Sequence, residues 1–301
     1  MGAKTKIEWT RGDDGSPGRT WNPVRGCSLV SDGCRRCYAM KQAHRFSGKG
    51  QPYEGLTETG PNGPRWNGKV RLVLEALEQP LHWKKPCRVF VNSMSDLFHK
   101  DVPADFIKQC FDVMEAAPQH TFQILTKRPE RIEPVLFGEE GGWYLGGGDY
   151  LPNIHLGVSV EDQPTADDRI KKLLAVAWEG VNFVSYEPAL AAVDFETGRG
   201  FLTGQSHDNA PYKGRYVNWL IVGGESGPRA RPCNLQWIRS VIAQCKAANV
   251  LAFVKQFGSN PVHETGGAVG VPQLTRYPLR DRKGGDMSEW PKDLQVRQWP
   301  K

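Results

Sequence analysis

The sequence lacks a long hydrophobic run. None of its apolar stretches approaches the roughly 18 to 20 residues that a membrane-spanning helix needs, and the start MGAKTKIEWT carries basic residues with no apolar stretch behind them. We therefore expect no membrane insertion, no export and a cytoplasmic protein. Hydrophobic residues at 39% and charged residues at 24%, with a mean hydropathy of −0.52, exclude a chain that is disordered throughout.

The sequence also lacks the cysteine pattern of a disulfide scaffold. Its 7 cysteines are an odd number in a chain long enough to bury a core, and Cys87, Cys110, Cys233 and Cys245 are scattered. The other three lie close together in residues 27–37. Clustered thiols in a reducing compartment are typical of metal ligands, so we expect a metal site in this segment.

Acidic residues are scarce near the N-terminus. Residues 1–50 hold ten Lys and Arg against four Asp and Glu, so this segment by itself carries a charge equal to the net +6 of the chain. Such a segment favours an anionic partner, with a solvated basic face as the alternative. The aromatic residues Trp9, Trp21, Tyr53 and Trp66 lie in or near it, and they either stack on bases or pack in the core.

Short β-branched runs alternate with stretches of helical spacing along most of the chain. The predicted strands are at 20–25, 87–92, 121–125, 154–159, 181–185, 219–222 and 250–254, and the helical patterns are at 37–46, 103–116, 129–137, 164–177 and 234–248. This alternation predicts an α/β fold, a partial (β/α) barrel of six or seven parallel strands. We expect the barrel to span 1–258, with loop insertions at 48–68, 138–152 and 198–216, and an irregular C-terminal extension at 259–301 to pack on it.

Polar side chains follow nearly every predicted strand. The carboxyl ends of parallel barrel strands share one face, where barrel enzymes build their active sites, so these side chains are candidates for a ligand site. Turn formation and helix capping are the alternative for any one group. The charged side chains among these candidates either recognise a carboxylate or a ribose of a ligand, or form structural ion pairs. The candidates are Asn92, Ser93, Ser95, Asp96, Thr126, Lys127, Arg128, Ser159, Glu161, Glu187, Gly223, Gly224 and Glu225.

The loop at 26–39 carries the spacing C-x6-C-x2-C directly after the first predicted strand, at Cys27, Cys34 and Cys37. Two residues between the last two cysteines let that pair chelate one metal. A structural zinc site has four protein ligands, for which His44 is the nearest further candidate. A 4Fe-4S cluster held by three cysteines leaves one iron open for a substrate or cofactor. The pattern favours the cluster, with zinc and an inert cysteine-rich loop as alternatives.

A three-cysteine loop after the first strand of a (β/α) barrel resembles the radical S-adenosylmethionine superfamily. The resemblance implies that the open iron binds the amino and carboxylate groups of S-adenosylmethionine. It implies reductive cleavage to a 5′-deoxyadenosyl radical, with a reductant such as flavodoxin or ferredoxin. Ser93, Ser95 or Asp96 then holds the methionyl amino group, Gly223-Gly224-Glu225 is similar to the superfamily's G-G-E-P strand end, and Asp96, Lys127 and Glu187 are the candidate catalytic residues.

Most of residues 6–258 also resemble a phage and prophage family of three-Cys-motif proteins. The matching stretches are KIEWT at 6–10, WNPVRGC at 21–27, GCRRCYA at 33–39, VNSMSDLF at 91–98, LTKRP at 125–129, GVSVE at 157–161, SYEP at 185–188 and VGGESGPRARP at 222–232. This resemblance implies a three-Cys-motif partner protein. With the basic N-terminal segment, it favours a nucleotide or nucleic acid as the substrate, in phage DNA modification or repair. The alternative is a zinc-bearing, non-catalytic nucleic-acid-binding or accessory protein.

Overall fold

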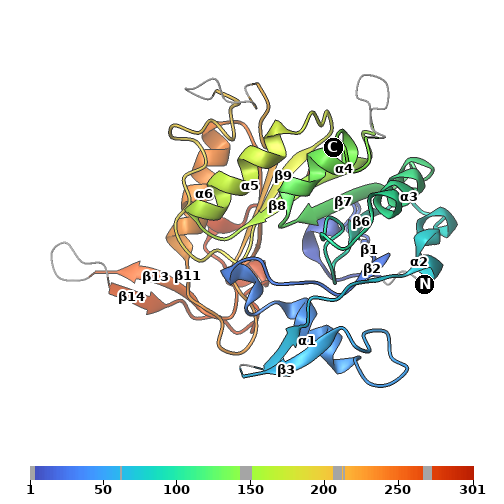
Figure 1. Ribbon diagram of the computed structural model, residues 1–301. Coiled ribbons are helices and arrows are strands. Elements are labelled where there is room, and N and C mark those ends of the chain that lie inside the picture. The colour runs from blue at the N-terminus through green and yellow to red at the C-terminus, as the bar shows by residue number, and fades with distance from the viewer. Residues whose placement is uncertain (1–3, 62, 143–150, 206–211, 213, 267–272) are drawn as a thin grey trace. The chain divides into compact units, whose positions relative to one another are not determined.

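The centre of the fold is a curled sheet of seven parallel strands (Figure 1). The computed structural model describes residues 4–61, 63–142, 151–205, 212, 214–266 and 273–301. The sheet order is β1-β6-β7-β8-β9-β10-β12. These strands are β1 (Arg19–Trp21), β6 (Arg88–Val91), β7 (Thr121–Thr126), β8 (Ile154–Val160), β9 (Asn182–Tyr186), β10 (Trp219–Gly223) and β12 (Leu251–Gln256). The predicted α/β partial barrel is confirmed.

Helices follow the strands, because the predicted helical stretches carry apolar residues on one side only. In α3, for example, the buried side includes Phe106, Cys110 and Met114. The α-helices are α1 (Tyr38–Arg45), α2 (Leu74–Leu77), α3 (Ala104–Glu115), α4 (Ile132–Leu136), α5 (Gln163–Ala175) and α6 (Leu235–Ala247). The 3-10 helices are η1 (Glu8–Thr10), η2 (Asp32–Cys34), η3 (Gln79–His82), η4 (Pro129–Arg131), η5 (Met287–Glu289) and η6 (Lys292–Leu294). None of the helices in the described parts of the chain has the length and hydrophobicity of a membrane-spanning segment.

The first predicted strand, 20–25, is wrong as a single element. Pro23 interrupts it, because proline has no N–H to donate to a sheet ladder. β1 joins the main sheet, whereas β2 (Val24–Arg25) pairs antiparallel with β5 (Arg71–Leu72). This break separates the segment that carries the cysteines from the sheet.

Two further small sheets lie outside the barrel sheet. The hairpin of β3 (Thr57–Gly60) and β4 (Gly63–Trp66) forms within the first predicted insertion and packs against α1 (Figure 1). The other sheet contains β11 (Cys233–Asn234), β13 (Pro261–Thr265) and β14 (Gln273–Arg276). Parts of the other predicted insertions, at 143–150, 206–211 and 213, and part of the C-terminal extension, at 267–272, lie outside the described residues.

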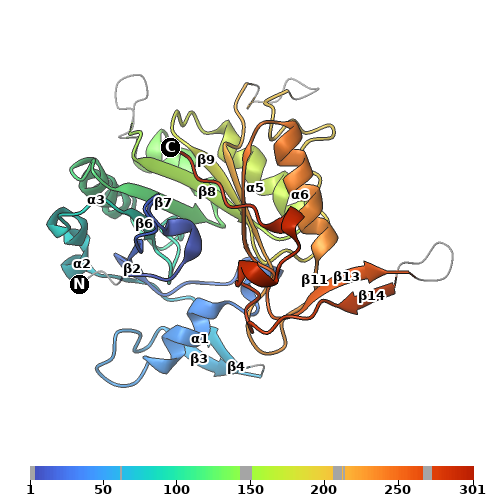
Figure 2. The ribbon, with the colours of Figure 1, turned by 180° about the vertical axis from the view of Figure 1, so that it is seen from behind.

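The contacts divide the chain into two compact units. The first contains residues 1–158 and 176–181, and the second contains residues 159–175 and 182–301, so β8 contributes to both. In the second unit the C-terminal segment lies along β12 (Figure 2). The Val254 N–H donates to the Val296 carbonyl at 2.8 Å, and the Gln298 N–H donates to the Ala252 carbonyl at 3.0 Å. The segment therefore satisfies backbone groups of an edge strand that would otherwise be open to pairing.

A buried polar pair lies within the sheet of the first unit. Gln123 of β7 and His155 of β8 are register partners, with 0% and 5% of their surfaces exposed. Among the described residues, the Gln123 amide and the His155 Nδ1 have no hydrogen-bond partner. Burial, helped by the charge of Arg88, lowers the pKa of His155 to about 4. The imidazole is therefore neutral at pH 7.

Protonation of His155 should destabilise the fold as the pH falls. The folded pKa of about 4 lies below the roughly 6.5 of an unfolded histidine, so the unfolded state binds the proton first. The stability is fully present above pH 6.5 and is lost between pH 6.5 and 4, by about 3 kcal/mol. Urea unfolding of the wild type and of His155→Gln between pH 6.5 and 4 measures this loss of unfolding free energy. The variant should not show the loss. An unchanged pH dependence in the variant would contradict the burial argument.

Candidate functional site

The three cysteines of the loop all belong to the first unit. Cys27 follows β2, Cys34 ends η2, and Cys37 immediately precedes α1. Cys27 and Cys37 pack against a small apolar cluster that includes Met40 and Trp66. Within the described residues, no group of three or more His, Cys, Asp and Glu side chains is arranged so that it could hold a metal ion.

The thiols nevertheless lie close enough to affect one another. Burial above all, together with the charges of Asp96, Cys37 and Cys34, raises the pKa of Cys27 to about 12, and Arg128 opposes this rise. Burial likewise raises the pKa of the Cys37 thiol, and Cys34 adds to this rise. Cys27 and Cys37 therefore stay protonated unless a cationic centre compensates their charge. Three cysteines supply the sulfur donors that an iron-sulfur or zinc centre takes, and the centre itself stays a prediction.

The turn after β6 holds the segment that leads into the cysteine loop. The Asn92 Oδ1 accepts from the Val24 N–H at 3.4 Å, and the Ser95 Oγ donates to the Val24 carbonyl at 2.7 Å. The Ser93 Oγ donates to the Asn22 side chain at 3.2 Å. Asn92 adopts a φ of 57°, a left-handed conformation that asparagine tolerates better than most residues. Three of the predicted cofactor-binding residues therefore contact residues 22–24.

Asp96, the fourth polar residue of this turn, is saturated with hydrogen bonds. Its Oδ1 accepts from the Phe98 N–H at 3.1 Å and the Thr126 hydroxyl at 2.7 Å. Its Oδ2 accepts from the Lys127 N–H at 3.2 Å and the Arg128 Nη1 at 2.8 Å. An ionised carboxylate offers about four lone-pair sites, so these four donors use its capacity. The role predicted for Asp96 at a ligand stays a prediction, and its observed partners are all protein groups.

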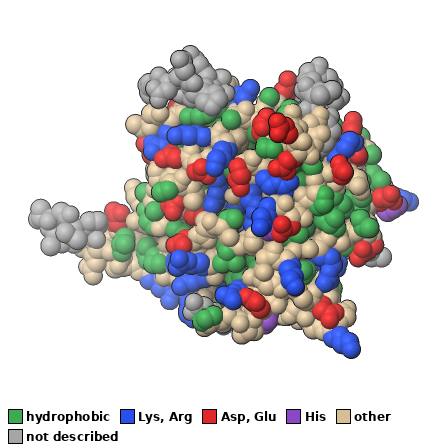
Figure 3. All heavy atoms as spheres, viewed as in Figure 1, with side chains coloured by type: hydrophobic (Ala, Val, Ile, Leu, Met, Phe, Trp, Pro, Cys, Tyr) green, Lys and Arg blue, Asp and Glu red, His purple; other side chains and the backbone are tan. Residues whose placement is uncertain are grey.

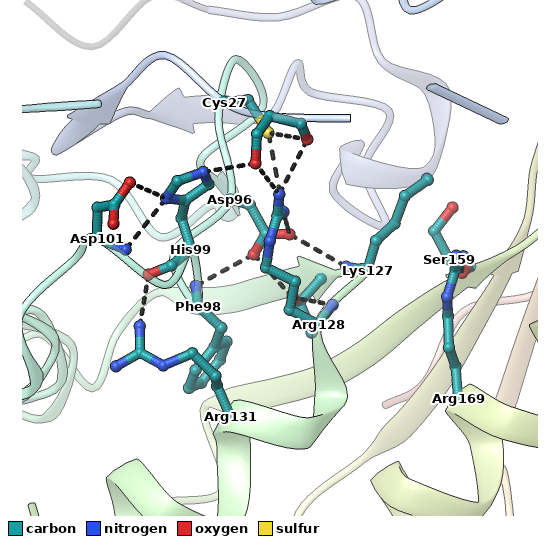
Figure 4. Close-up of polar contacts among 12 residues, drawn as sticks. Cys27, Asp96, Phe98, His99, Asp101, Lys127, Arg128, Arg131, Ser159 and Arg169 are labelled. Carbon is teal, nitrogen blue, oxygen red and sulfur yellow. Dashed lines mark hydrogen bonds and ion pairs between the residues drawn. The ribbon is translucent and has the colours of Figure 1, made fainter. Parts of the chain in front are cut away.

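Arg128 connects Asp96 to the cysteine loop (Figure 4). Its Nη2 donates to the carbonyl and the hydroxyl of Ser28 at 2.9 and 2.8 Å, and its Nη1 lies 3.9 Å from the Cys27 Sγ. The Arg128 and Asp96 side chains are only 6% and 7% exposed. A single buried guanidinium thus contacts both Cys27 and Ser28 of the cysteine loop and Asp96 of the turn after β6.

Ser28, His99 and Asp101 contact one another as the members of a nucleophilic triad do. The donors and acceptors of their hydrogen bonds, however, are the reverse of those in a triad. The Asp101 N–H donates to the His99 Nδ1 at 3.2 Å, and burial lowers the pKa of His99. The neutral ring therefore carries its proton on Nε2, which lies 2.8 Å from the Ser28 Oγ. A general base needs a free lone pair at this nitrogen to accept the serine proton. This arrangement therefore holds Ser28 in place rather than activating it.

The polar residues at the end of β8 form a buried ion pair in the second unit. The Arg169 Nη1 donates to the Ser159 carbonyl at 2.6 Å and pairs with the Glu161 Oε2 at 3.0 Å. The Arg169 and Glu161 side chains are 6% and 0% exposed. Both predicted ligand residues, Ser159 and Glu161, are thus contacted by an arginine that we did not single out from the sequence.

The ends of β9, β10 and β12 also carry paired charges within the second unit. The Lys255 Nζ lies 2.7 Å from both carboxylate oxygens of Glu187, and the Arg231 Nη2 lies 2.7 Å from the Glu225 Oε1. The cation beside Glu187 is thus Lys255, and the side chains of both residues are mostly buried. Each of these carboxylates therefore has a cation of its own unit beside it.

Position 224 requires glycine, because another backbone segment of the second unit passes too close to leave room for a side chain. A Cβ there would lie 2.1 Å from the Phe257 carbonyl oxygen and 2.9 Å from the Cys233 Cβ. The neighbouring Gly223 is less constrained, since its nearest contact would be the Gln256 carbonyl oxygen at 3.3 Å. The Gly-Gly pair thus has a packing reason, and its predicted contact with a cofactor stays a prediction.

His44, the nearest candidate for a fourth ligand, makes a hydrogen bond through one of its ring nitrogens. The His44 Nδ1 lies 3.0 Å from the Thr57 hydroxyl, on the hairpin that packs against α1. His99 and Asp96 have the protein partners given above, whereas the hydrogen bond at the His44 Nδ1 leaves the Nε2 of that ring for a metal. His44 therefore stays the candidate for a fourth ligand in the zinc alternative.

The aromatic residues near the basic segment pack rather than face a partner. Trp9, Trp21 and Trp66 are 2%, 0% and 6% exposed. The Tyr53 and Trp66 rings lie 6.3 Å apart. On the face seen in Figure 3, Lys and Arg side chains are interspersed with Asp and Glu side chains. Base stacking by the three tryptophans is therefore not supported, and the predicted anionic partner depends mainly on charge.

Removal of one charge from the buried Glu161–Arg169 pair should destabilise the fold strongly. Arg169→Met leaves an uncompensated buried carboxylate, which costs about 3–5 kcal/mol. Arg199→Met is the matched control, because the Arg199–Asp167 pair is 26% and 33% exposed and should cost no more than about 1 kcal/mol. Urea unfolding measures both values. Equal losses in the two variants would contradict the role assigned to burial.

Comparison of the chain with curated proteins and with solved structures gave no match. A family model described as "Protein of unknown function (DUF5131)" matches residues 4–292. The matched range contains the cysteine loop and every strand of the barrel sheet. It also contains the residues of the Asp96–Arg128 pair and the charged strand ends of the second unit. Because the match runs through nearly the whole chain, the protein belongs to the DUF5131 family.

Proposed function

We propose that this protein is an iron-sulfur enzyme of the radical S-adenosylmethionine type, in which Cys27, Cys34 and Cys37 hold a 4Fe-4S cluster. The observation that carries the proposal is the donor set. Cys27 interacts electrostatically with the other two thiols of the segment, and within the described residues no group of three or more His, Cys, Asp and Glu side chains is arranged to hold a single metal ion. A zinc site of structural type needs a fourth protein ligand, whereas a cluster with three thiolate ligands leaves one iron open.

The charges around the thiols also support a bound cationic centre. The Cys27 thiol is raised in pKa to about 12 by burial and by the nearby Asp96, so it becomes a thiolate only beside strong positive charge. The Arg128 guanidinium provides part of that charge at 3.9 Å. When bound, the cluster supplies an open coordination position and one electron for the reductive cleavage of the sulfonium of S-adenosylmethionine.

The remaining residues have supporting or binding roles in this proposal. The Asn92 Nδ2 is buried and has no partner among the described residues, so it is the donor of the β6 turn best placed to take a ligand. Thr126 and Asp96 are bonded to each other, which favours a supporting role for both. Lys127 and Glu187 stay the proposed catalytic residues. Ser93, Ser95, Ser159, Glu161, Gly223, Gly224 and Glu225 stay proposed S-adenosylmethionine contacts.

The proposed substrate is a nucleotide or nucleic acid. The excess of ten basic over four acidic residues in 1–50 supports an anionic substrate, because opposite charge raises the encounter rate and the affinity. The resemblance to three-Cys-motif proteins supports action on phage DNA and a three-Cys-motif partner protein. A flavodoxin or ferredoxin would deliver the electron.

Metal analysis tests the cluster directly. Protein reconstituted anaerobically should contain about four iron and four sulfide per chain and show the broad visible absorption of a 4Fe-4S centre. Cys34→Ala should lose both iron and sulfide because two thiolates hold the cluster too weakly. Cys87→Ala is the matched control, since Cys87 is also a half-buried free cysteine of the first unit and should keep both.

Stoichiometric zinc without iron, bound by the same three cysteines, would overturn the enzyme proposal. That result would favour the alternative of a zinc-bearing nucleic-acid-binding or accessory protein.

Product analysis tests the reaction. Dithionite-reduced protein mixed with S-adenosylmethionine should release 5′-deoxyadenosine, detected by chromatography, even without the natural substrate. Cys37→Ala should abolish this release, whereas Cys110→Ala, a buried cysteine on α3, should retain it. An intact cluster that neither binds nor cleaves S-adenosylmethionine would instead indicate electron transfer or a structural role.

A further inference from the structure

We infer that Arg128, oriented by Asp96, is a positioning residue that fixes the first thiol of the cysteine loop and stabilises a cluster bound there. This inference rests on the proposed function, because it concerns the same three cysteines. It assigns Arg128 a role beyond the carboxylate or ribose recognition expected from its place at the end of β7.

The three thiols are unequally spaced along the chain. Two residues separate Cys34 from Cys37, and α1 begins directly after Cys37, so local structure restrains this pair. Six residues separate Cys27 from Cys34, and within this spacer Leu29 and Val30 are each 45% exposed. The chain alone therefore restrains Cys27 less than the other two thiols, and a precise ligand set requires another restraint.

The contacts of Arg128 supply this restraint. The Arg128 Nη2 donates to both oxygens of Ser28, the residue next to Cys27, and the Nη1 is shared between Asp96 at 2.8 Å and the Cys27 Sγ at 3.9 Å. The planar fork of a guanidinium can make these contacts together, which the single ammonium of lysine cannot. His99 bonds the Ser28 hydroxyl at 2.8 Å from another direction.

Arg128 is itself held in a fixed orientation. The four hydrogen bonds that Asp96 accepts fix the orientation of its carboxylate. The backbone N–H of Arg128 also donates to the Thr126 hydroxyl at 2.9 Å. Moving Arg128 would unpair a carboxylate that is only 7% exposed. The guanidinium therefore stays beside Cys27, where its charge opposes the negative charge of thiolate ligands. Groups of this kind around a metal centre tune its retention and its reduction potential.

The test compares reconstituted wild type with Arg128→Met. Iron release to a chelator under anaerobic conditions should be about tenfold faster in the variant, in line with the loss of other supporting contacts at metal sites. The midpoint potential should become more negative, because a nearby positive charge favours the reduced, more negative cluster. Arg199→Met, which removes a guanidinium paired with Asp167, should leave release rate and potential at the wild-type values.

Two milder variants keep the test decisive if Arg128→Met fails to fold. Arg128→Lys keeps the charge and loses the fork, so its potential should stay near that of the wild type while iron release is faster. Ser28→Ala removes one of the two contacts to Ser28, and its release rate should lie between those of wild type and Arg128→Lys.

The outcomes separate this inference from the proposed function. Wild type that takes up no iron overturns both. Wild type that holds a cluster, with variants at Arg128 and Ser28 that match it in release rate and potential, overturns only the positioning role.

Discussion

The buried pair of Asp96 and Arg128 is the contact on which the arrangement around the cysteines depends. Two charges with side chains 7% and 6% exposed are costly to remove from water, and the cost is offset only when every donor and acceptor is satisfied. Asp96 meets this condition with four donors, and Arg128 meets it by reaching Ser28. The position of the first thiol is therefore a consequence of satisfying a buried carboxylate 69 residues further along the chain.

Pairing of a carboxylate with a nearby cation also occurs within the second unit. Glu161, Glu187 and Glu225 follow successive strands, and their cations are Arg169, Lys255 and Arg231. Strand ends of a parallel sheet gather polar groups because their turns leave backbone and side chains outside the ladder. Pairing each carboxylate with a cation fixes its orientation. Sites preorganised in this way can orient a polar ligand without rearranging, although such pairs also occur where no ligand binds.

The sequence predicted where polar residues lie better than it predicted what they contact. Strands β6 to β10 and β12 were predictable because short β-branched runs recur between helical patterns, whereas the break at Pro23 shows that one residue outweighed the apolar pattern of 20–25. The interaction partners of these polar residues could not be predicted from the sequence. Arg128 lies 32 residues from Asp96 and 100 from Ser28, and Lys255 lies 68 residues from Glu187. Pairs at such separations are set by packing of the sheet, which periodicity does not encode.

The cysteine loop combines two fixed ends with an open middle. At one end Arg128 and His99 hold Ser28, and at the other the Tyr38 hydroxyl donates to the Ser93 carbonyl at 2.6 Å. Between them Leu29 and Val30 leave almost half of their surface exposed. Contacts at the ends limit the positions available to the thiols, while the exposed residues can move aside at little cost in burial. A loop of this construction can take up a bulky inorganic group without disturbing the sheet, because the adjustment is confined to residues that the core does not use.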